Sequence, residues 1–308
     1  MKKAFVLMAV AAVAMCATSC KKDGVYKPGK QIAQILRVHD ADGSTSPYET
    51  WVWNGNLLDS ITYHWLVSNG EPGIETFTYD GNRLVASDYR DGHATYIYDG
   101  KRLVRIAFVG TNPRYVSSTV TYDFEYDGKQ VSTIIVTTHA ETAAKAQPIS
   151  MLRMLLPEPV CEQIRRDGQH DIDEAAALDA KKVSDIVRTY KLTWEGSNVV
   201  KVEVESHRLN ETTAYTSVIE MTYDDKNSPY RGLRDETRMF YDDQYIGLSS
   251  NNMRTYKDIT MYPGEEEPEE VTITKTYKYD EDGYPVECFI EEVYYGNSNT
   301  GKLIFEYK

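Results

Sequence analysis

The sequence predicts a mainly all-β fold: a large, curved antiparallel β-meander built of repeated hairpins, with a short α-helical insertion near residues 150–188. Three observations lead to this fold class. A hairpin motif recurs along most of the chain, tyrosine far outnumbers phenylalanine (24 against 7), and the motif is missing from one alanine-rich segment. Tyrosine suits a half-buried pleated surface, where its ring packs and its hydroxyl lies in water.

The hairpin motif is clearest at residues 95–109, TYIYDGKRLVRIAFV, where an alternating run enters Asp99-Gly100 and a second alternating run leaves it. Asp-Gly between two apolar runs is a strong hairpin signal, because a tight type I′ turn needs positive φ at both central residues. We therefore expect Asp99 and Gly100 at the centre of the turn. Further copies of the motif begin at Trp51, Phe77, Phe124, Leu192, Met221 and Tyr277.

The remaining strands follow in chain order. Residues 31–38 alternate and predict the first strand, and four hairpin units between residues 50 and 139 predict about eight more. After the units at Leu192 and Met221, the predicted strands are Met253–Met261, Val271–Tyr279, Val286–Tyr295 and a closing strand, Lys302–Tyr307. A barrel, a half-pipe and a two-sheet sandwich all fit this number of strands.

The segment 143–188 contains no hairpin motif. Pro157 and Pro159 open a short helical pattern that ends at Gly168, and Asp171–Val187 has alanine-rich helical propensity with acids in its first turn. We interpret this segment as a helical insertion. It could be a lid, a partner-binding element or a plug over one face of the sheet, and we favour the plug because a single sheet otherwise leaves one apolar face in water.

The N-terminus has the pattern of a lipoprotein signal peptide over residues 1–19. A basic start precedes the apolar run Ala4–Ala14, which is too short to span a bilayer. The run is followed by Ala-Thr-Ser-Cys, which resembles a bacterial lipobox with Cys20 as the lipidated residue. An ordinary secretory signal with an incidental Cys20 is the alternative. Lipidation would anchor the protein in the cell envelope, at the outer membrane, on either its periplasmic or its surface face.

The leader and the motifs divide the chain into three parts. Residues 1–19 are the signal peptide, residues 20–29 are a polar tether broken by Gly and Pro, and residues 30–308 form a single β-sheet domain that carries the insertion at 143–188. Two cysteines remain in this domain, Cys161 and Cys288. An exported protein permits a disulfide between them, but we favour two separate buried thiols.

The net charge of the chain limits the classes of partner that we expect it to bind. The formal net charge is −13 at pH 7. Nucleic acids and anionic membrane surfaces attract basic patches, so the charge argues against both as direct partners. We expect a monomer whose negative charge serves solubility, held at a membrane only through the lipid on Cys20.

Three features carry a resemblance to a family of Bacteroidetes lipoproteins described as having a porphyrin-binding-like fold. They are the lipobox at Cys20, the Y-x-Y-D-G hairpins and the run Tyr223–Leu233, YDDKNSPYRGL. The hairpins are also loosely similar to the YD repeats of large bacterial shell-forming proteins, which carry a Gly-Arg pair that this chain lacks. The resemblance implies a large, curved, mainly antiparallel sheet over most of the mature chain, and it implies no particular activity.

Three histidines lie at similar distances after the starts of their hairpin units: His93, His139 and His207. If the units share a register, these residues approach one rim of the sheet. Neutral imidazoles on one rim could ligate haem iron or a divalent metal. Polar strand ends often carry histidine, and we favour that simpler explanation. We therefore expect no metal site and no cofactor, with haem the one cofactor that the histidines suggest.

Tryptophans offer a second candidate binding surface. Trp51 and Trp53 alternate along one predicted strand, and Trp65 and Trp194 lie on others. Indole rings on a sheet face could stack on the sugar rings of a glycan. Packing in the core is the alternative that we favour, because large aromatic side chains dominate core energetics.

The usual catalytic motifs are missing from the sequence: HExxH, G-x-S-x-G, S-x-x-K, a glycine-rich phosphate loop and CxxC. We therefore expect a lipid-anchored cell-envelope protein that is not an enzyme, of binding or scaffold type, with a glycan or an envelope protein as its ligand. Haem or porphyrin binding through the rim histidines is the first alternative. A polysaccharide hydrolase, with two carboxylates brought together by facing strands, is the second.

Overall fold

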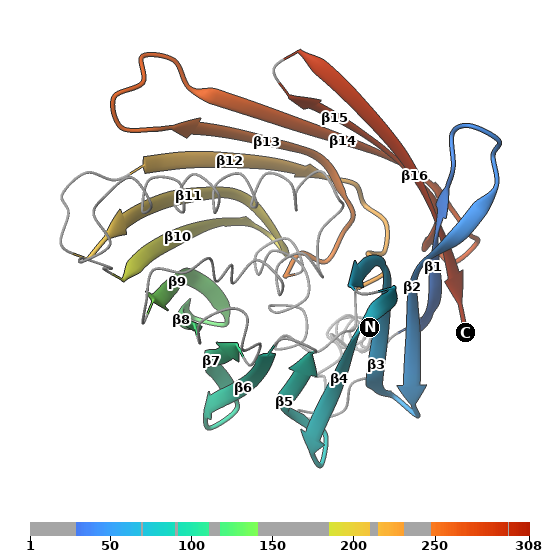
Figure 1. Ribbon diagram of the computed structural model, residues 1–308, viewed down its shortest axis with the longest axis horizontal. Helices are drawn as coiled ribbons and strands as arrows, with labels where there is room; N and C mark the ends of the chain where they lie inside the picture. The colour runs from blue at the N-terminus through green and yellow to red at the C-terminus, as the bar shows by residue number, and fades with distance from the viewer. Residues whose placement is uncertain are drawn as a thin grey trace, which may run out of the picture.

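The computed structural model describes residues 29–68, 70–89, 92–110, 118–140, 185–209, 215–230, 248–294 and 296–308. Within these ranges the chain forms a single antiparallel sheet, and its first strand pairs with its last. The sheet is therefore a closed barrel (Figure 1). Of the three closures that the sequence leaves open, the barrel is the one formed.

The strands follow one another round the barrel in chain order, so the colours of Figure 1 run once round the ring and β16 meets β1. They are β1 (Ile32–Val38), β2 (Thr45–Asn54), β3 (Leu57–Ser68), β4 (Glu71–Asp80), β5 (Arg83–Tyr89), β6 (Gly92–Asp99), β7 (Arg102–Gly110), β8 (Ser118–Asp127), β9 (Gln130–Ala140), β10 (Ile186–Glu195), β11 (Asn198–Arg208), β12 (Tyr215–Tyr223), β13 (Met253–Met261), β14 (Glu269–Tyr279), β15 (Pro285–Tyr294) and β16 (Asn297–Tyr307).

Most predicted strands are confirmed. Met253–Met261 has the predicted bounds, and the four units between residues 50 and 139 form β2 to β9. The predicted last strand, Lys302–Tyr307, lies within β16, and Phe305 of β16 pairs with Ile35 of β1. The repeated hairpins therefore generate the antiparallel meander that the motif predicts.

The predicted helical insertion at 143–188 lies outside the described residues except at its end. There the prediction is wrong, because β10 begins at Ile186. Ile186 and Val187 pair with Thr138 and Thr137 of β9. Both residues are β-branched and suit a pleated surface once a neighbouring strand is available. No helix within the described ranges is long and apolar enough to cross a bilayer.

The hairpin turns lie one residue later than predicted. Asp99 ends β6 and pairs with Arg102, so the central residues of this turn are Gly100 and Lys101. Gly100 has a φ of 59°, in the left-handed region that glycine adopts without steric penalty. The glycine is therefore at the first central position, and the prediction of Asp99 there is wrong.

One face of the barrel wall is buried and the other is exposed. In β4, Glu75 and Phe77 are buried, whereas the alternating Ile74 and Thr76 are exposed. Successive side chains of a strand point to opposite faces, and the outer face of a closed barrel is the one open to solvent. The buried residues therefore face inward. They are mostly aliphatic and aromatic, and the outward face is rich in threonine and charged side chains.

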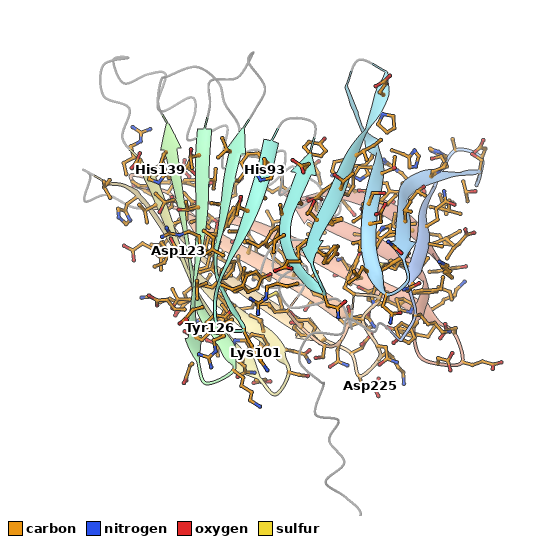
Figure 2. All side chains as sticks on the ribbon, turned by 90° about the horizontal axis from the view of Figure 1, so that it is seen from below. His93, Lys101, Asp123, Tyr126, His139 and Asp225 are labelled. Atoms are coloured by element: carbon orange, nitrogen blue, oxygen red, sulfur yellow. The ribbon has the colours of Figure 1, made fainter. Side chains whose placement is uncertain are left out.

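The tight turns of β2–β3, β4–β5, β6–β7, β8–β9 and β10–β11 lie at one end of the barrel, which we call the turn end; the opposite end is the far end. Figure 2 shows Lys101 and Tyr126 toward the turn end and His93 and His139 toward the far end. Next to these turns the pairing shifts by one residue in each hairpin, for example between Ile97 and Tyr98 of β6. Such a bulge bends the strand and takes one residue out of the ladder.

In seven of the strand pairs that meet at the turn end, an aromatic side chain donates a hydrogen bond to a bulge carbonyl of the pair before it in the ring. In β6, the Tyr98 hydroxyl donates to the carbonyl of Leu84 at 2.6 Å, and Leu84 is the bulge residue opposite Tyr79. We call these donors the aromatic belt. The bonds are Trp53 to Ile32, Tyr79 to Leu58, Tyr98 to Leu84, Tyr126 to Leu103, Trp194 to Val131, Tyr277 to Met253 and Tyr307 to Pro285.

The aromatic belt corrects one sequence expectation. Tyrosine hydroxyls were expected in water, but those of Tyr79, Tyr98 and Tyr126 donate to backbone carbonyls of a neighbouring hairpin. Two arginines also link neighbouring hairpins at the turn end, each donating to the hairpin that follows its own in the ring. Arg83 donates to the Gly100 carbonyl at 2.9 Å while its guanidinium lies 4.7 Å from the Tyr98 ring centroid. Arg102 donates to Gly128 and lies over Tyr126 in the same manner.

The longer connection from β12 to β13 is fastened to the turn end by a polar network. Asp224 accepts hydrogen bonds from the backbone N–H groups of Lys226 (2.9 Å) and Asn252 (3.2 Å) and from the Tyr279 hydroxyl. Tyr230 then stacks on Trp51 of the inner wall, with ring centroids 6.2 Å apart. The run that carries the family resemblance therefore has a structural role in its described part, Tyr223–Tyr230.

Replacing Tyr98 with phenylalanine tests the aromatic belt. The ring and its contact with Arg83 remain, but the Leu84 carbonyl loses its donor. We expect the free energy of unfolding to fall by about 1–2 kcal/mol, the cost of leaving a half-buried acceptor without its partner. Chemical denaturation measures this. Thr95→Ser, on the outer face of the same strand, should change stability by less than about 0.5 kcal/mol. Equal effects of the two substitutions would contradict the role of the hydroxyl.

Candidate functional site

The inner wall of β2 to β6 carries a polar cluster within an otherwise apolar interior. We call it the Glu75 cluster; its members are Glu49, Tyr63, Trp65, Glu75, Ser87 and Tyr96. The Tyr63 hydroxyl donates to one carboxyl oxygen of Glu75 at 3.0 Å, and both residues are 0% exposed. Alternation along β4 puts Glu75 on the same face as the core residue Phe77, which forces the carboxyl into the barrel.

Burial raises the pKa of Glu75 to about 8, and hydrogen bonds from Ser87 and Tyr63 offset only part of this rise. The carboxyl is therefore protonated at neutral pH and can donate as well as accept a hydrogen bond. Glu49, on the other side of Tyr63, accepts a hydrogen bond from the Trp51 indole at 3.0 Å. The cluster thus combines a neutral carboxyl with aromatic N–H and O–H groups.

Two polar atoms of the Glu75 cluster are buried without a hydrogen-bond partner among the described residues: Oε1 of Glu75 and Nε1 of Trp65. Buried polar atoms are normally paired, so these two call for a water or a ligand atom. Trp65 stacks on Tyr48, with ring centroids 5.8 Å apart, and meets the edge of Tyr63 at 6.1 Å. The indole is only half-buried, so part of its surface stays open. This is the place on the inner wall best suited to a ligand.

A second buried acid lies on the other side of the barrel. Asp258 of β13 accepts hydrogen bonds from the hydroxyls of Ser217, Thr260 (3.1 Å) and Tyr256 (3.4 Å). Burial raises its pKa, and these hydroxyls offset part of the rise. In the ring, β13 is seven strands from β4. The wall therefore does not place Asp258 beside Glu75 as a carboxylate pair.

The three candidate histidines lie at the far end of the barrel and face outward. His93 and His139 share one rung, through Val109 of β7 and Thr119 of β8. Three strand spacings of about 4.8 Å separate them by about 14 Å, too far to ligate one ion. His207 is on the neighbouring rung, opposite Val187. His93 and His139 therefore share a register, and His207 is displaced from it by two residues along the wall. The register brings His93 and His139 toward one end of the barrel but not to one site (Figure 2).

Two of these histidines have carboxylate partners. His93 Nδ1 lies 2.7 Å from Asp88, and His139 Nδ1 lies 2.8 Å from Asp185. Nδ1 of His207 is buried and has no hydrogen-bond partner among the described residues. Across the described part of the chain, no three His, Cys, Asp or Glu side chains form a group that could hold a metal ion. Haem ligation by these residues stays a prediction without support from their placement.

The candidate tryptophans face inward. Trp51 is 4% exposed and stacks on Trp53 at 5.9 Å, and the Trp53 indole donates to the Ile32 carbonyl at 2.6 Å. An exposed stacking platform on the outer sheet face is therefore not what these two residues form. Trp194 has the same structural role as Trp53, donating to Val131. The core-packing alternative describes them, and only Trp65 combines an open surface with an unpartnered N–H.

The cysteines are not joined in the described residues. Cys288 faces inward on β15 as a buried free thiol, and burial raises its pKa to about 11. A thiol with that pKa is unreactive at neutral pH. Cys20 and Cys161 lie outside the described residues, so the lipidation of Cys20 and a buried thiol at Cys161 stay predictions.

The Glu75 cluster was not among the sequence candidates. Its signal was present, however, because Glu75 stands between Gly73 and Phe77 on the apolar face of an alternating strand. An acid in phase with core residues is a sign of a buried carboxyl. The acids in the turns, in contrast, have local structural roles. Asp280, for example, accepts a hydrogen bond from the backbone N–H of Asp282 at 3.0 Å.

Comparisons with known proteins add two structural likenesses. A porin-like protein from Bacteroides uniformis matches with 10% sequence identity and a TM-score of 0.49, over 92% of this chain and 100% of that one. A porin-like protein from Bacteroides vulgatus matches with 11% identity and a TM-score of 0.38, over 90% and 99%. Both TM-scores are below 0.5, so neither likeness bears on function. No family model and no curated protein matches the chain, and the resemblance to the porphyrin-binding-like family stays a prediction.

The neutral state of Glu75 can be tested by Glu75→Gln, which keeps shape and hydrogen-bonding capacity but cannot ionise. The ordinary pKa of the carboxyl is 4.5 and its folded value is about 8. Between these values the folded protein holds a proton that the unfolded chain has lost, so wild-type stability falls as pH rises. The stability of the variant relative to wild type should therefore grow by about 1.4 kcal/mol per pH unit across this window.

Denaturation at several pH values between 5 and 8 measures this difference. Glu203→Gln is the matched control, because Glu203 is exposed on β11 and its pKa is lowered by the neighbouring Lys201. The control should show no rise over the same window. A constant difference between Glu75→Gln and wild type would mean that Glu75 is already ionised at pH 5.

Proposed function

We propose that the protein is a lipid-anchored barrel of the cell envelope whose outer wall lies in water, and that it binds a ligand and does not catalyse a reaction. One observation carries the proposal: the wall has its apolar face inside and its polar face outside. A wall of this kind does not attach the protein to a membrane. In this proposal the lipid on Cys20, at the lipobox, provides the attachment.

The outer wall is unsuited to lipid. On β14 the outward residues are Glu270, Thr272, Thr274, Thr276 and Lys278. On β8 they include Thr121, Asp123 and Glu125, and Asp123 pairs with Arg105 of β7 at 2.5 Å. A transmembrane barrel needs an outward apolar band about 25 Å tall, flanked by aromatic girdles. Here the aromatic residues form the belt on the inside, so the polarity of the wall is reversed.

The ligand that the inner wall supports best is a glycan, with an envelope protein as the other class proposed. Sugar-binding sites combine an aromatic surface with a few directed polar groups. The half-buried indole of Trp65, its unpartnered N–H and the neutral Glu75 carboxyl provide both. The inner acids otherwise accept hydrogen bonds from the protein itself, as Asp258 does from hydroxyls and Glu49 from an indole, which supports binding over hydrolysis.

Membrane attachment is tested by comparing the full chain with a variant in which residues 1–19 are replaced by a cleavable secretory signal and Cys20 by serine. The full chain should incorporate labelled palmitate and fractionate with membranes. The variant should incorporate none and stay in the soluble envelope fraction without detergent. A variant that still sediments with membranes and needs detergent would show that the wall itself inserts, against the proposal.

Glycan binding is tested by titrating neutral hexose oligosaccharides into the protein and following tryptophan emission. We expect a saturable change that is lost in Trp65→Phe, which removes the N–H and reduces the stacking surface. Trp194→Phe is the matched control, because that indole donates to the Val131 carbonyl in the aromatic belt. A response that survives Trp65→Phe, or no response in the wild type, would remove the glycan and leave a protein ligand.

A further inference from the structure

We infer that the turn end of the barrel faces the membrane surface and that the far end points away from it. The inference rests on the proposed lipidation of Cys20. It follows from where the chain enters the barrel and from the length of chain between that point and the lipid. In this orientation the turn end lies next to the lipid headgroups.

The first described residues are fixed to the turn end from both sides. Lys30 pairs with Asp280 at 2.5 Å and with Asp282 at 2.8 Å, both in the β14–β15 turn. The Gln31 side chain donates to the carbonyl of Gly55, in the β2–β3 turn, at 2.7 Å. The Gln31 carbonyl also accepts from the backbone N–H of Lys308 at 2.8 Å. These contacts hold the start of the domain at the level of the turns.

The length of the tether decides which end can approach a bilayer. Nine residue steps join Cys20 to Gly29 and span at most about 32 Å when fully extended. A flexible chain of this length has an end-to-end distance of about 17 Å. Strands of about ten residues are about 33 Å long, and a tilt near 40° makes the barrel about 25 Å tall. Turning the far end to the membrane would stretch the tether along the whole wall, at a large cost in chain entropy.

The two ends differ in what they present. The turn end carries two-residue turns with exposed Asn56, Asn82 and Lys129 at their tips. The far end carries most of the longer connections, including that of β13–β14 with exposed Glu265, Glu266 and Glu267. The turn end also carries exposed acids, among them Asp80, Asp99 and Asp127, so the charges do not choose between the ends and the orientation rests on the tether.

Energy transfer to the bilayer tests the orientation. The lipidated full-length protein, with Cys161→Ser, is reconstituted into phosphatidylethanolamine–phosphatidylglycerol vesicles that contain an acceptor-labelled lipid. A donor is attached at Asn82→Cys or Lys129→Cys on the turn end, or at Ala41→Cys or Glu266→Cys on the far end. Transfer from the turn end should be at least about twofold more efficient, because the height of the barrel separates the two pairs.

Vesicle flotation separates the two ways of failing. Protein that floats but shows equal or reversed transfer from the two ends overturns the orientation and leaves the anchor intact. Protein that does not float overturns the anchor, and the orientation with it. Inserting twenty Gly and Ser residues between Lys27 and Pro28 should bring the ratio of the two efficiencies toward one. A ratio unchanged by the insertion would overturn the tether as the cause.

Discussion

The barrel depends on one interaction, the hydrogen bond from an aromatic side chain of one hairpin to the bulge carbonyl of the hairpin before it. A closed sheet has to bend, and here each hairpin bends through a bulge beside its turn. The bulge takes a carbonyl out of the ladder, and an unpaired half-buried carbonyl is costly. Tyr98 and its equivalents satisfy these carbonyls, so the bend in one hairpin is stabilised by the next. The same bonds cross the closure of the barrel, since Trp53 of β2 donates to Ile32 of β1. Phenylalanine has the ring but lacks the donor, which explains why the belt positions carry tyrosine or tryptophan.

This interaction shows why the sequence predicts the hairpins well and the closure poorly. A turn glycine, an aromatic residue two positions before it and alternation on both sides are local, and strands such as β6 and β7 follow from them directly. Closure depends on the pairing of Phe305 with Ile35, which no local pattern reveals. The end of the predicted insertion failed for a related reason. Ile186 and Val187 fit an apolar helical stripe and a strand equally well, and the neighbouring strand β9 decides between them.

The candidate residues show the same limit at the level of single side chains. Register along the hairpins placed His93 and His139 on one rung, as their spacing predicts. Register fixes height along the barrel, however, and says nothing of position around it, so two strands, β7 and β8, still lie between the two imidazoles. The face of the sheet on which a residue lies matters as well. Alternation along β2 points the Trp51 side chain inward, to the core. Glu75 could have been found by applying that alternation to acids, since it is in phase with Phe77.

The proposed function depends on which face of the barrel wall is apolar. The strand count alone fits a channel as well as a container, because barrels of this size occur with an aqueous interior. The positions of the side chains separate the two. Threonine and paired charges such as Arg105 with Asp123 are common on the outside, beside scattered exposed apolar residues such as Ile74, and the aromatic belt and the aliphatic core line the inside. Such a wall has its apolar contacts inside and a mainly polar surface outside, which is the arrangement that water around it favours. Under the proposed function the lipid on Cys20 attaches the protein to the membrane, and the first described residues, Lys30 and Gln31, are held at the turn end.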